Sequence, residues 1–447
     1  MTGLSWEYEF NLSEVSNMRK IKQLEYCLLL CILVLATVCS GEAMRYDYPF
    51  EDPYEATILG TPEKAKAPLP KKIRIKERAM TVFPDREVPE IFWYNKKLLY
   101  SVARQRQKAP LIFMIAGTGA GHDSAKMQMM QKAFFQAGFH VVSISSPTHP
   151  SFIVGASSLS LPGDIRSDSR DLYRVMELAW QKEQKSIEVS DFFLTGYSLG
   201  GSQSAFVAKL DEEQKLFNFK KVLMINPALN LYDSAVRIDK MFVNNIPGGI
   251  DQFNAWYEKL MANVTESYKH GDFVDLSYGF FYNAYDEIVP SQSEAKAVIG
   301  FSFRVSLATM LFVSDVMTNS GLIVPKNLQL KRTASLTDYS KVSARAGGFS
   351  LYAEDLLFPA FKDKRPSLSM KQFVHDNSLR SIESYLRNAK KIALVTNEND
   401  FILGAGDVDY LKQVFQSRAR IYPKGGHCGN MAYKDNVAYM IDYFKNP

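Results

Sequence analysis

The sequence predicts an α/β fold in which a mostly parallel sheet carries helices on both faces. Short apolar runs alternate with amphipathic, helix-like segments along most of the 447-residue chain, as in proteins whose strands are joined by crossover helices. The run 110–116, PLIFMIA, is apolar throughout, which is typical of a strand buried on both faces of a sheet. Glycine-rich turns follow several of these runs, so the polar residues of interest are expected beyond the strand ends.

The predicted elements begin at the end of a lysine- and proline-rich stretch, 61–77. Residues 73–83 and 90–103 have strand composition and are expected to pair with each other. From about Ser169 onwards, apolar residues recur at helical spacing, which predicts an amphipathic helix. The further predicted strands are 110–116, 139–146, 191–196, 221–226, 391–396 and 419–422, and the further helices are 124–137, a segment ending near Ala208, 408–415 and 436–444.

The alternation of strands and helices stops between residues 232 and 386. This stretch is too long for a plain loop, so we expect a largely helical cap insertion over the carboxyl ends of the strands. Its large apolar side chains either form the cap's own core or line an apolar pocket; they are Phe253, Trp256, Tyr257, Met261, Phe280, Phe281, Tyr282, Met310 and Phe312. The predicted boundaries are 1–43 for an N-terminal extension and signal peptide, 44–72 for a linker, 73–231 and 387–447 for the two parts of the sheet domain, and 232–386 for the cap.

The composition argues against several classes of function. The chain is 46% hydrophobic and carries a net charge of +5 without a dense block of Lys and Arg, which argues against nucleic-acid binding. Gly117, Gly119 and Gly121 do not form a dinucleotide-binding loop, because His122 stands where that fingerprint needs a glycine. The sequence has no HExxH motif, no paired CxxC motif and no close pair of histidines, so we expect neither a metal ion nor another cofactor.

The N-terminal residues have the character of a secretory signal peptide. A basic start at 18–22 precedes an apolar run at 26–38, which would extend about 20 Å as a helix and is too short for a hydrocarbon core of about 30 Å. Residues 1–17 contain three glutamates, so we expect the true start to be Met18. Cleavage is expected after Ser40 or Ala43, giving an exported protein that is periplasmic, envelope-associated or secreted.

The cysteines bear on how the protein is attached and folded. Cys39 ends the sequence ATVC, which faintly resembles a bacterial lipobox, so a lipid on Cys39 or an uncleaved N-terminal anchor is the membrane-associated alternative to a soluble mature form. Cys428 is the one cysteine beyond this segment, so an internal disulfide is not expected. We interpret Cys428 as a small packing residue.

Three of the polar groups at the predicted strand ends have the residue types of nucleophilic catalysis. A serine hydroxyl needs an imidazole as its base, and the imidazole needs a carboxylate to orient it. Ser198, Asp400 and His427 supply these groups in that chain order, which is the order of the nucleophile-elbow pattern. The groups lie in the stretches GYSLGG at 196–201, NEND at 397–400 and GGHCGN at 425–430.

On these motifs the chain resembles an α/β-hydrolase-fold serine hydrolase of the esterase and lipase kind, from about Ile73 to the C-terminus, with a cap that matches no particular subfamily. The resemblance implies hydrolysis of a small-molecule or lipid-like carboxylic ester through an acyl-enzyme. It leaves open two alternatives, an amidase or peptidase with the same triad and a non-catalytic binding protein with the same fold. The roles it implies are nucleophile for Ser198, acid for Asp400, base for His427, elbow glycines for Gly196 and Gly200, and oxyanion donors from Leu199 and from either Thr118 or Gly119.

Other residues compete for some of these roles. Glu398 lies two residues before Asp400, and Asp233 follows the predicted strand 221–226, so either is an alternative acid. His427 is the one histidine after Asp400, which favours it as the base. His122 is expected to border the oxyanion loop or to lie on the surface.

Overall fold

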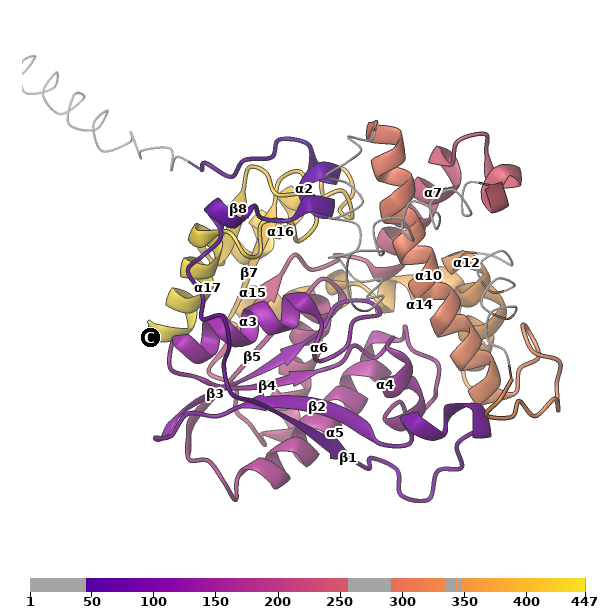
Figure 1. Ribbon diagram of the computed structural model, residues 1–447, viewed down its shortest axis with the longest axis horizontal. Coiled ribbons are helices and arrows are strands. Elements are labelled where there is room, and N and C mark those ends of the chain that lie inside the picture. Colours follow the sequence, from indigo (N-terminus) through magenta and orange to yellow (C-terminus); the bar gives the residue numbers. More distant parts are fainter. Residues whose placement is uncertain (1–45, 256–290, 335–338, 340–342, 344–347, 447) are drawn as a thin grey trace, which may run out of the picture. The chain divides into compact units, whose positions relative to one another are not determined.

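The computed structural model describes residues 46–255, 291–334, 339, 343 and 348–446. These residues fold around one β-sheet. Within these residues the sheet has eight strands in the order β1-β2-β4-β3-β5-β6-β7-β8 (Figure 1). Strand β2 is antiparallel to both its neighbours, and all other pairs are parallel. The strands are β1 Ile75–Met80, β2 Leu98–Ala103, β3 Ala109–Ile115, β4 His140–Ile144, β5 Val189–Tyr197, β6 Lys221–Ile225, β7 Ile392–Asn397 and β8 Ala419–Tyr422.

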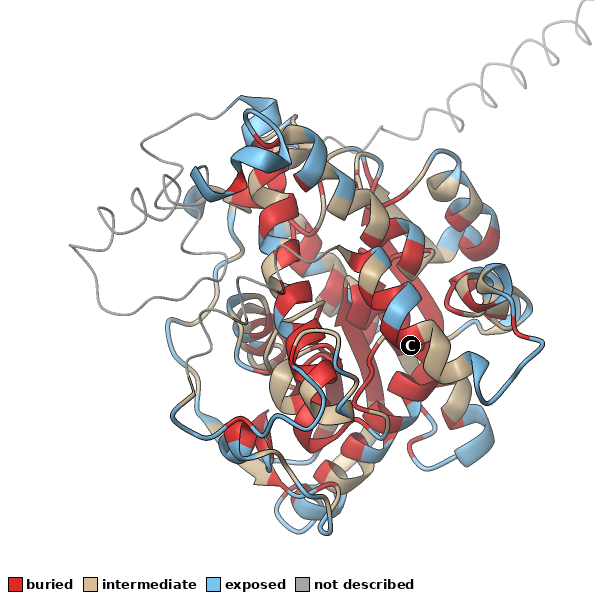
Figure 2. Cartoon of the chain, turned by 90° about the vertical axis from the view of Figure 1, so that its right-hand side faces the viewer, coloured by how far each residue is buried: buried red, intermediate tan, exposed pale blue. Residues whose placement is uncertain are grey.

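Helices cover both faces of this sheet, as the sequence predicts. On β3, Leu111, Phe113 and Ile115 belong to the core cluster that also contains residues of the two helices α5 and α6. Ile112 and Met114 of β3 point to the opposite face and are also fully buried, which matches the buried strands at the centre of Figure 2. Helices α3 and α17 pack against each other through Phe134 and Phe444, whose ring centroids lie 5.5 Å apart. The helices are α3 Ala125–Gln136, α5 Ile165–Glu183, α6 Leu199–Gln214, α16 Asp407–Phe415 and α17 Lys434–Lys445.

The expected strand over 90–103 is wrong in its first half. Residues Glu90–Asn95 form the 3-10 helix η2, and strand β2 begins only at Leu98. Pro89 precedes η2 with its φ at −50°, a geometry that suits the start of a helix. The aromatic residues that suggested a strand point in different directions from the 3-10 turn. Phe92 is buried, whereas Trp93 and Tyr94 are exposed.

The regular elements that the structure describes between β6 and β7 are all helices. Helix α10 is long and apolar enough to cross a membrane by length and composition, and 61% of its most apolar window is buried inside the structure. Residues of α10 share a core cluster with Ile153 and Val154 of α4, Pro150–Gly155. The elements are α7 Leu231–Asn245, η3 Ile250–Gln252, α10 Gln292–Thr318, α12 Phe349–Leu351, η4 Tyr352–Leu357, α13 Phe358–Lys362, α14 Met370–Asp376, η5 Leu379–Ile382 and α15 Glu383–Asn388.

The described apolar residues of this region pack among themselves. Phe253 lies in a cluster with Phe242 and Phe301, and Met310 and Phe312 belong to the larger cluster around α10. Their packing agrees with the interpretation that such side chains form the cap's own core. The remaining candidates for a pocket lining lie outside the described residues: Trp256, Tyr257, Met261, Phe280, Phe281 and Tyr282.

The segment 44–72, interpreted from sequence as a linker, contains ordered elements. Helix α2 spans Pro53–Leu59 and a short 3-10 turn, η1, spans Glu63–Ala65. The Asp52 side chain caps α2 by accepting hydrogen bonds from the first backbone amides. These elements belong to the compact unit Tyr48–Pro447, whereas the unit 1–47 has only its last two residues described. The predicted signal peptide and Cys39 therefore lie outside the described residues.

Gly300 sets how closely α10 and α7 approach, and it gives a test of the cap packing. A Cβ at Gly300 would lie 2.4 Å from the Phe242 amide nitrogen. Alanine is the better helix former by about 1 kcal/mol, yet we expect Gly300→Ala to lose about 1–3 kcal/mol because the two helices must separate. Thermal unfolding of this variant should show a lower Tm.

The exposed residue Ser302 on the same helix provides the control. Ser302→Ala changes helix propensity in the same direction at an exposed position, so its Tm should equal or exceed that of the wild type. A Gly300→Ala protein as stable as the wild type would contradict the close packing of α7 on α10.

Candidate active site

The turn between β5 and α6 holds Ser198 in a strained backbone conformation. Ser198 has a φ of 55° and a ψ of −123°, in the left-handed half of the map that L-residues rarely adopt. Its amide donates a hydrogen bond of 2.8 Å to the Ile225 carbonyl of the neighbouring strand β6. Such strain persists where the surrounding structure fixes it, and it is typical of functional positions.

The glycines around Ser198 are required by backbone contacts on three sides. A Cβ at Gly196 would lie 2.3 Å from the Gly200 carbonyl oxygen, and one at Gly200 would lie 2.3 Å from the Ile115 carbonyl oxygen. Gly201 is bounded in the same way by the Ile225 carbonyl oxygen at 2.9 Å. Because these neighbours are backbone atoms, no side-chain rearrangement can make room for a larger residue. The turn thus places the Ser198 side chain at the carboxyl ends of the strands.

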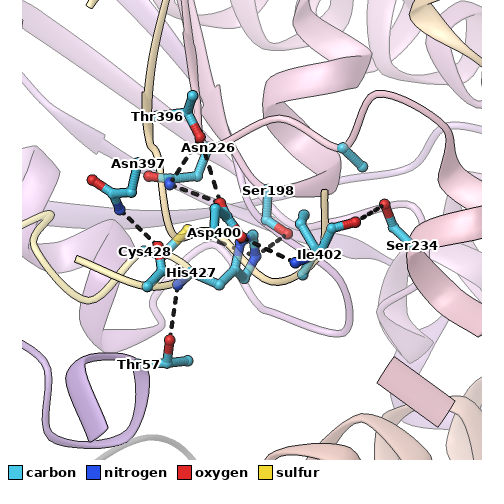
Figure 3. A network of polar contacts seen from close by, with 12 residues as sticks. Thr57, Ser198, Asn226, Ser234, Thr396, Asn397, Asp400, Ile402, His427 and Cys428 are labelled. Carbon is cyan, nitrogen blue, oxygen red and sulfur yellow. Dashed lines mark hydrogen bonds and ion pairs between the residues drawn. The ribbon is translucent and has the colours of Figure 1, made fainter. Parts of the chain in front are cut away.

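Ser198, His427 and Asp400 form a continuous hydrogen-bonded chain (Figure 3). The His427 Nε2 lies 2.9 Å from the Ser198 Oγ, and the His427 Nδ1 lies 3.1 Å from each oxygen of Asp400. An ionised carboxylate only accepts, so in the neutral imidazole Nδ1 carries the proton and Nε2 is free to accept from the serine hydroxyl. The Asp400 side chain is completely buried, and that of His427 is 16% exposed.

The strand order and the positions of these three residues identify the fold. Ser198 follows β5 on a sharp turn into a helix, Asp400 follows β7, and His427 follows β8, all at one edge of a mostly parallel eight-stranded sheet. The chain has the α/β-hydrolase fold. The resemblance noted from the sequence is thus confirmed at the level of the fold.

Solved structures of α/β hydrolases are similar to this chain at low sequence identity. An esterase of Pyrococcus furiosus is 9% identical, with 83% of this chain and 91% of that chain covered at a TM-score of 0.42. The peroxisomal alpha-beta-hydrolase Lpx1 of Saccharomyces cerevisiae is 11% identical, with 84% and 89% covered at a TM-score of 0.41. The alpha/beta hydrolase GrgF of a Penicillium species is 14% identical, with 83% and 98% covered at a TM-score of 0.40. No protein-family model and no curated protein matches the chain.

The geometry separates Asp400 from the two alternative acids. Glu398 forms an ion pair with Lys412, 2.9 Å away, on the exposed surface. Asp233 is exposed in the first turn of α7, where its own amide is capped by Asn230. Among the described carboxylates, therefore, Asp400 is the partner of the His427 imidazole.

Asn226 supports Asp400 and was not anticipated from the sequence. It follows β6 with a φ of 44° and is buried. Its side-chain Nδ2 donates a 2.9 Å hydrogen bond to the Asp400 Oδ2, while the Ile402 amide donates to Oδ1 at 3.2 Å. These donors fix the orientation of the carboxyl group toward the imidazole. The signal available in the sequence was the polar residue that directly follows the apolar strand 221–225.

The loop after β3 supplies one side of the expected oxyanion site. A Cβ at Gly117 would lie 3.2 Å from the Ser198 Cβ, so this loop passes beside the serine. The Gly119 amide is already used, because it donates a 2.8 Å hydrogen bond to the Thr148 Oγ1. The Thr118 amide donates to no acceptor within the described segments, and the Leu199 amide lies in the first turn of α6, where amides lack helical partners. Thr118 and Leu199 are therefore the donors that the geometry leaves available.

Two residues beside the site have structural contacts. The Cys428 thiol is buried and lies 3.8 Å from the His427 Nε2. His122 is a buried residue of the loop that follows β3, and its Nδ1 lies 3.2 Å from the Ser101 Oγ while its Nε2 lies 3.8 Å from Glu77. Burial lowers the pKa of His122. Within the described residues, no cluster of three or more His, Cys, Asp or Glu side chains is arranged to hold a metal ion.

A cavity of about 380 Å³ lies in the cap and does not include the triad. Its wall combines charged and apolar residues of α7 with residues of α12, η4 and α14. Asp233, the rejected alternative acid, belongs to this wall. The lining residues are Tyr232, Asp233, Val236, Arg237, Lys240, Phe349, Ser350, Ala353, Glu354, Met370 and Val374.

The charge of Asp400 sets the protonation behaviour of His427. Burial by itself lowers the pKa of the imidazole, but the Asp400 carboxylate, the neighbouring Cys428 and the hydrogen bonds outweigh it, so the pKa is raised above its ordinary value of 6.5. The neutral form is the one that accepts a proton, so it becomes available as the pH rises through this raised value.

Replacing the carboxylate tests this assignment. In Asp400→Asn the attraction for the imidazolium is lost and the burial remains, so we expect the pKa of His427 to fall to 6.5 or below. Titration of the imidazole followed by NMR measures the change. Asp233→Asn is the control and should leave the titration unchanged; a shift in that variant instead would move the acid to α7.

Proposed function

We propose that the protein is a serine hydrolase that cleaves a carboxylic ester through an acyl-enzyme intermediate. The observation that supports this most directly is the unbroken hydrogen-bonded chain from the Ser198 Oγ through His427 to the buried Asp400. A serine in an ordinary glycine-rich turn has no need of an imidazole at 2.9 Å or of a strained backbone.

The first chemical step follows from the positions of the protons. As the Ser198 Oγ attacks the ester carbonyl, the His427 Nε2 accepts the hydroxyl proton and then returns it to the leaving alcohol. The resulting imidazolium is stabilised by Asp400, whose carboxyl group is held in place by hydrogen bonds from Asn226 and the Ile402 amide. Water then repeats the sequence on the acyl-enzyme, with His427 again acting as the base.

The negative charge on the carbonyl oxygen needs hydrogen-bond donors. We assign this role to the amides of Leu199 and Thr118, since the Gly119 amide is held by Thr148. Such preorganised donors contribute about 3–4 kcal/mol each to stabilisation of the transition state. The helix dipole of α6 adds to this effect, because the Leu199 amide lies at its positive end.

The substrate is proposed to be a small-molecule or lipid-like ester. Helix α10 lies against the oxyanion loop, since a Cβ at Gly119 would be 2.9 Å from the Ser306 Oγ. The acyl or alcohol portion of a substrate at Ser198 therefore lies beside the cap. An amide or peptide substrate would use the same triad, and the leaving group determines which class is cleaved.

A covalent probe distinguishes a hydrolase from a binding protein. We expect a fluorophosphonate to label the purified protein at Ser198, and we expect Ser198→Ala to abolish both the labelling and the turnover of short-chain p-nitrophenyl esters. Labelling is read by intact mass, and the modified residue is located by peptide mapping.

Cys428→Ala is the matched control, because it removes the other nucleophilic side chain near His427 and should leave labelling intact. Labelling that persists in Ser198→Ala would disprove the nucleophile assignment. A wild type that neither reacts with the probe nor cleaves any ester or amide would favour a binding protein with this fold.

We also propose that the protein is exported and that its N-terminal extension is removed. This proposal rests on the basic residues 18–22, the apolar run 26–38 and the small residues that follow. The proposed mature form begins between Cys39 and Met44, shortly before the first described residues.

Intact mass of the processed protein checks the export proposal. A mass that corresponds to a start between Cys39 and Met44 is expected, with the protein in the aqueous phase after detergent partitioning. A start before Leu24 together with membrane retention would show an uncleaved anchor, and an added diacylglyceryl mass on Cys39 would show a lipoprotein.

A further inference from the structure

The loop that carries His427 has an unusual backbone. Gly425, Gly426 and Cys428 all have positive φ, at 145°, 56° and 63°. Two of the three are glycines, which adopt such angles readily, but Cys428 is not. A non-glycine residue in this region costs about 1–3 kcal/mol and is retained only where neighbouring groups fix it. The position of the imidazole therefore depends on what holds residues 425–429.

One set of contacts comes from the end of β7. The Asn397 Nδ2 donates a 2.7 Å hydrogen bond to the Gly426 carbonyl, and the Gly426 amide donates to the Asn399 Oδ1 at 2.9 Å. Asn430 completes this side by exchanging hydrogen bonds with Asn397. These contacts fix the peptide groups on either side of Gly426, but they leave the amide of His427 itself unpaired.

The amide of His427 is paired by a residue distant in sequence. It donates a 2.8 Å hydrogen bond to the Thr57 Oγ1 (Figure 3), and the Thr57 hydroxyl donates to the Pro53 carbonyl at 2.6 Å. Thr57 is buried in α2. A single threonine thus connects the backbone of the base to the first turn of an N-terminal helix.

Two glycines allow α2 to approach this loop closely. A Cβ at Gly426 would lie 2.1 Å from the Pro53 carbonyl oxygen, and one at Gly429 would lie 2.0 Å from the Ala56 carbonyl oxygen. Both contacts are with the backbone of α2, so this helix is seated against the loop. Figure 1 shows α2, in indigo, beside the yellow C-terminal part of the chain.

Further contacts fasten the residues around α2 to the same C-terminal stretch. The Thr61 Oγ1 donates to the Gly429 carbonyl at 3.0 Å, and the Ala67 amide donates to the Ala432 carbonyl at 2.9 Å. We call residues 48–67 the N-terminal clamp. Outside the clamp itself, the hydrogen bonds of Thr57, Thr61 and Ala67 go to the C-terminal stretch 427–432. The clamp also contacts helix α10, through a hydrogen bond from Gln292 to Asp52, and Phe401, through the Tyr54 ring.

We propose that Thr57 is a positioning residue for His427 and that the N-terminal clamp holds the base in register with Ser198. This inference rests on the proposed hydrolase function. Without the Thr57 oxygen, the His427 amide is buried with no acceptor, and the loop relieves this by moving. The imidazole then leaves the position in which its Nε2 lies 2.9 Å from the Ser198 Oγ.

The experiment compares Thr57→Val with Thr57→Ser and with Thr61→Val. Valine keeps the shape of threonine and removes the acceptor, so we expect kcat to fall about 10- to 100-fold, as for a displaced catalytic group, with KM little changed. Serine restores the acceptor and should restore kcat to within about threefold. Thr61→Val removes another hydroxyl from the same clamp without touching His427, so its kcat should stay near that of the wild type.

Stability and imidazole titration separate positioning from general loosening. Tm is measured for all three variants, and the proposal is overturned if Thr57→Val and Thr61→Val lose kcat in equal proportion to their loss of Tm. Equal kcat in Thr57→Val and the wild type overturns it as well. If the wild type turns over no substrate, the proposed hydrolase function fails. The positioning role is then tested separately by the NMR titration of His427, and a titration that is the same in Thr57→Val and in the wild type overturns it.

Discussion

The left-handed backbone at Ser198 is the constraint on which the rest of the site depends. It requires glycine at 196, 200 and 201, because the carbonyl groups of β3, β6 and α6 leave no space for a Cβ. The same packing brings the end of β6 beside the serine, where Asn226 reaches Asp400. The strain at one residue therefore fixes the relative positions of three strands and of the carboxylate that orients the base.

Much of this arrangement was predictable because its signals are local or depend on chain order. The apolar runs located the strands, since a buried strand needs apolar residues on both faces. The glycines around Ser198 and the order of Ser198, Asp400 and His427 predicted the three residues that the structure brings together. The apolar runs and the glycines are recognised from adjacent residues, and the three catalytic candidates are recognised from the order of their motifs along the chain.

Other features depend on tertiary packing and left little trace in the sequence. Asn226 and Thr57 are single polar residues whose partners lie 174 and 370 positions away. The aromatic residues of 90–95 resembled a strand, but burial of Phe92 against the cap and exposure of Trp93 favoured a 3-10 turn. The lysine- and proline-rich composition of 61–77 suggested a linker, although Thr61 and Ala67 within it donate hydrogen bonds to the C-terminal stretch.

The separation of 370 residues between Thr57 and His427 has a consequence for biosynthesis. A ribosome releases the helix that carries Thr57 long before it makes the loop that this helix contacts. Throughout that interval the N-terminal helix has no docking surface, and closing so long a loop is entropically costly and slow. The nucleophile and its supporting strands come from a nearly continuous stretch, whereas the base is held only when both ends of the domain have met. The chain is therefore built so that its reactive centre is completed last.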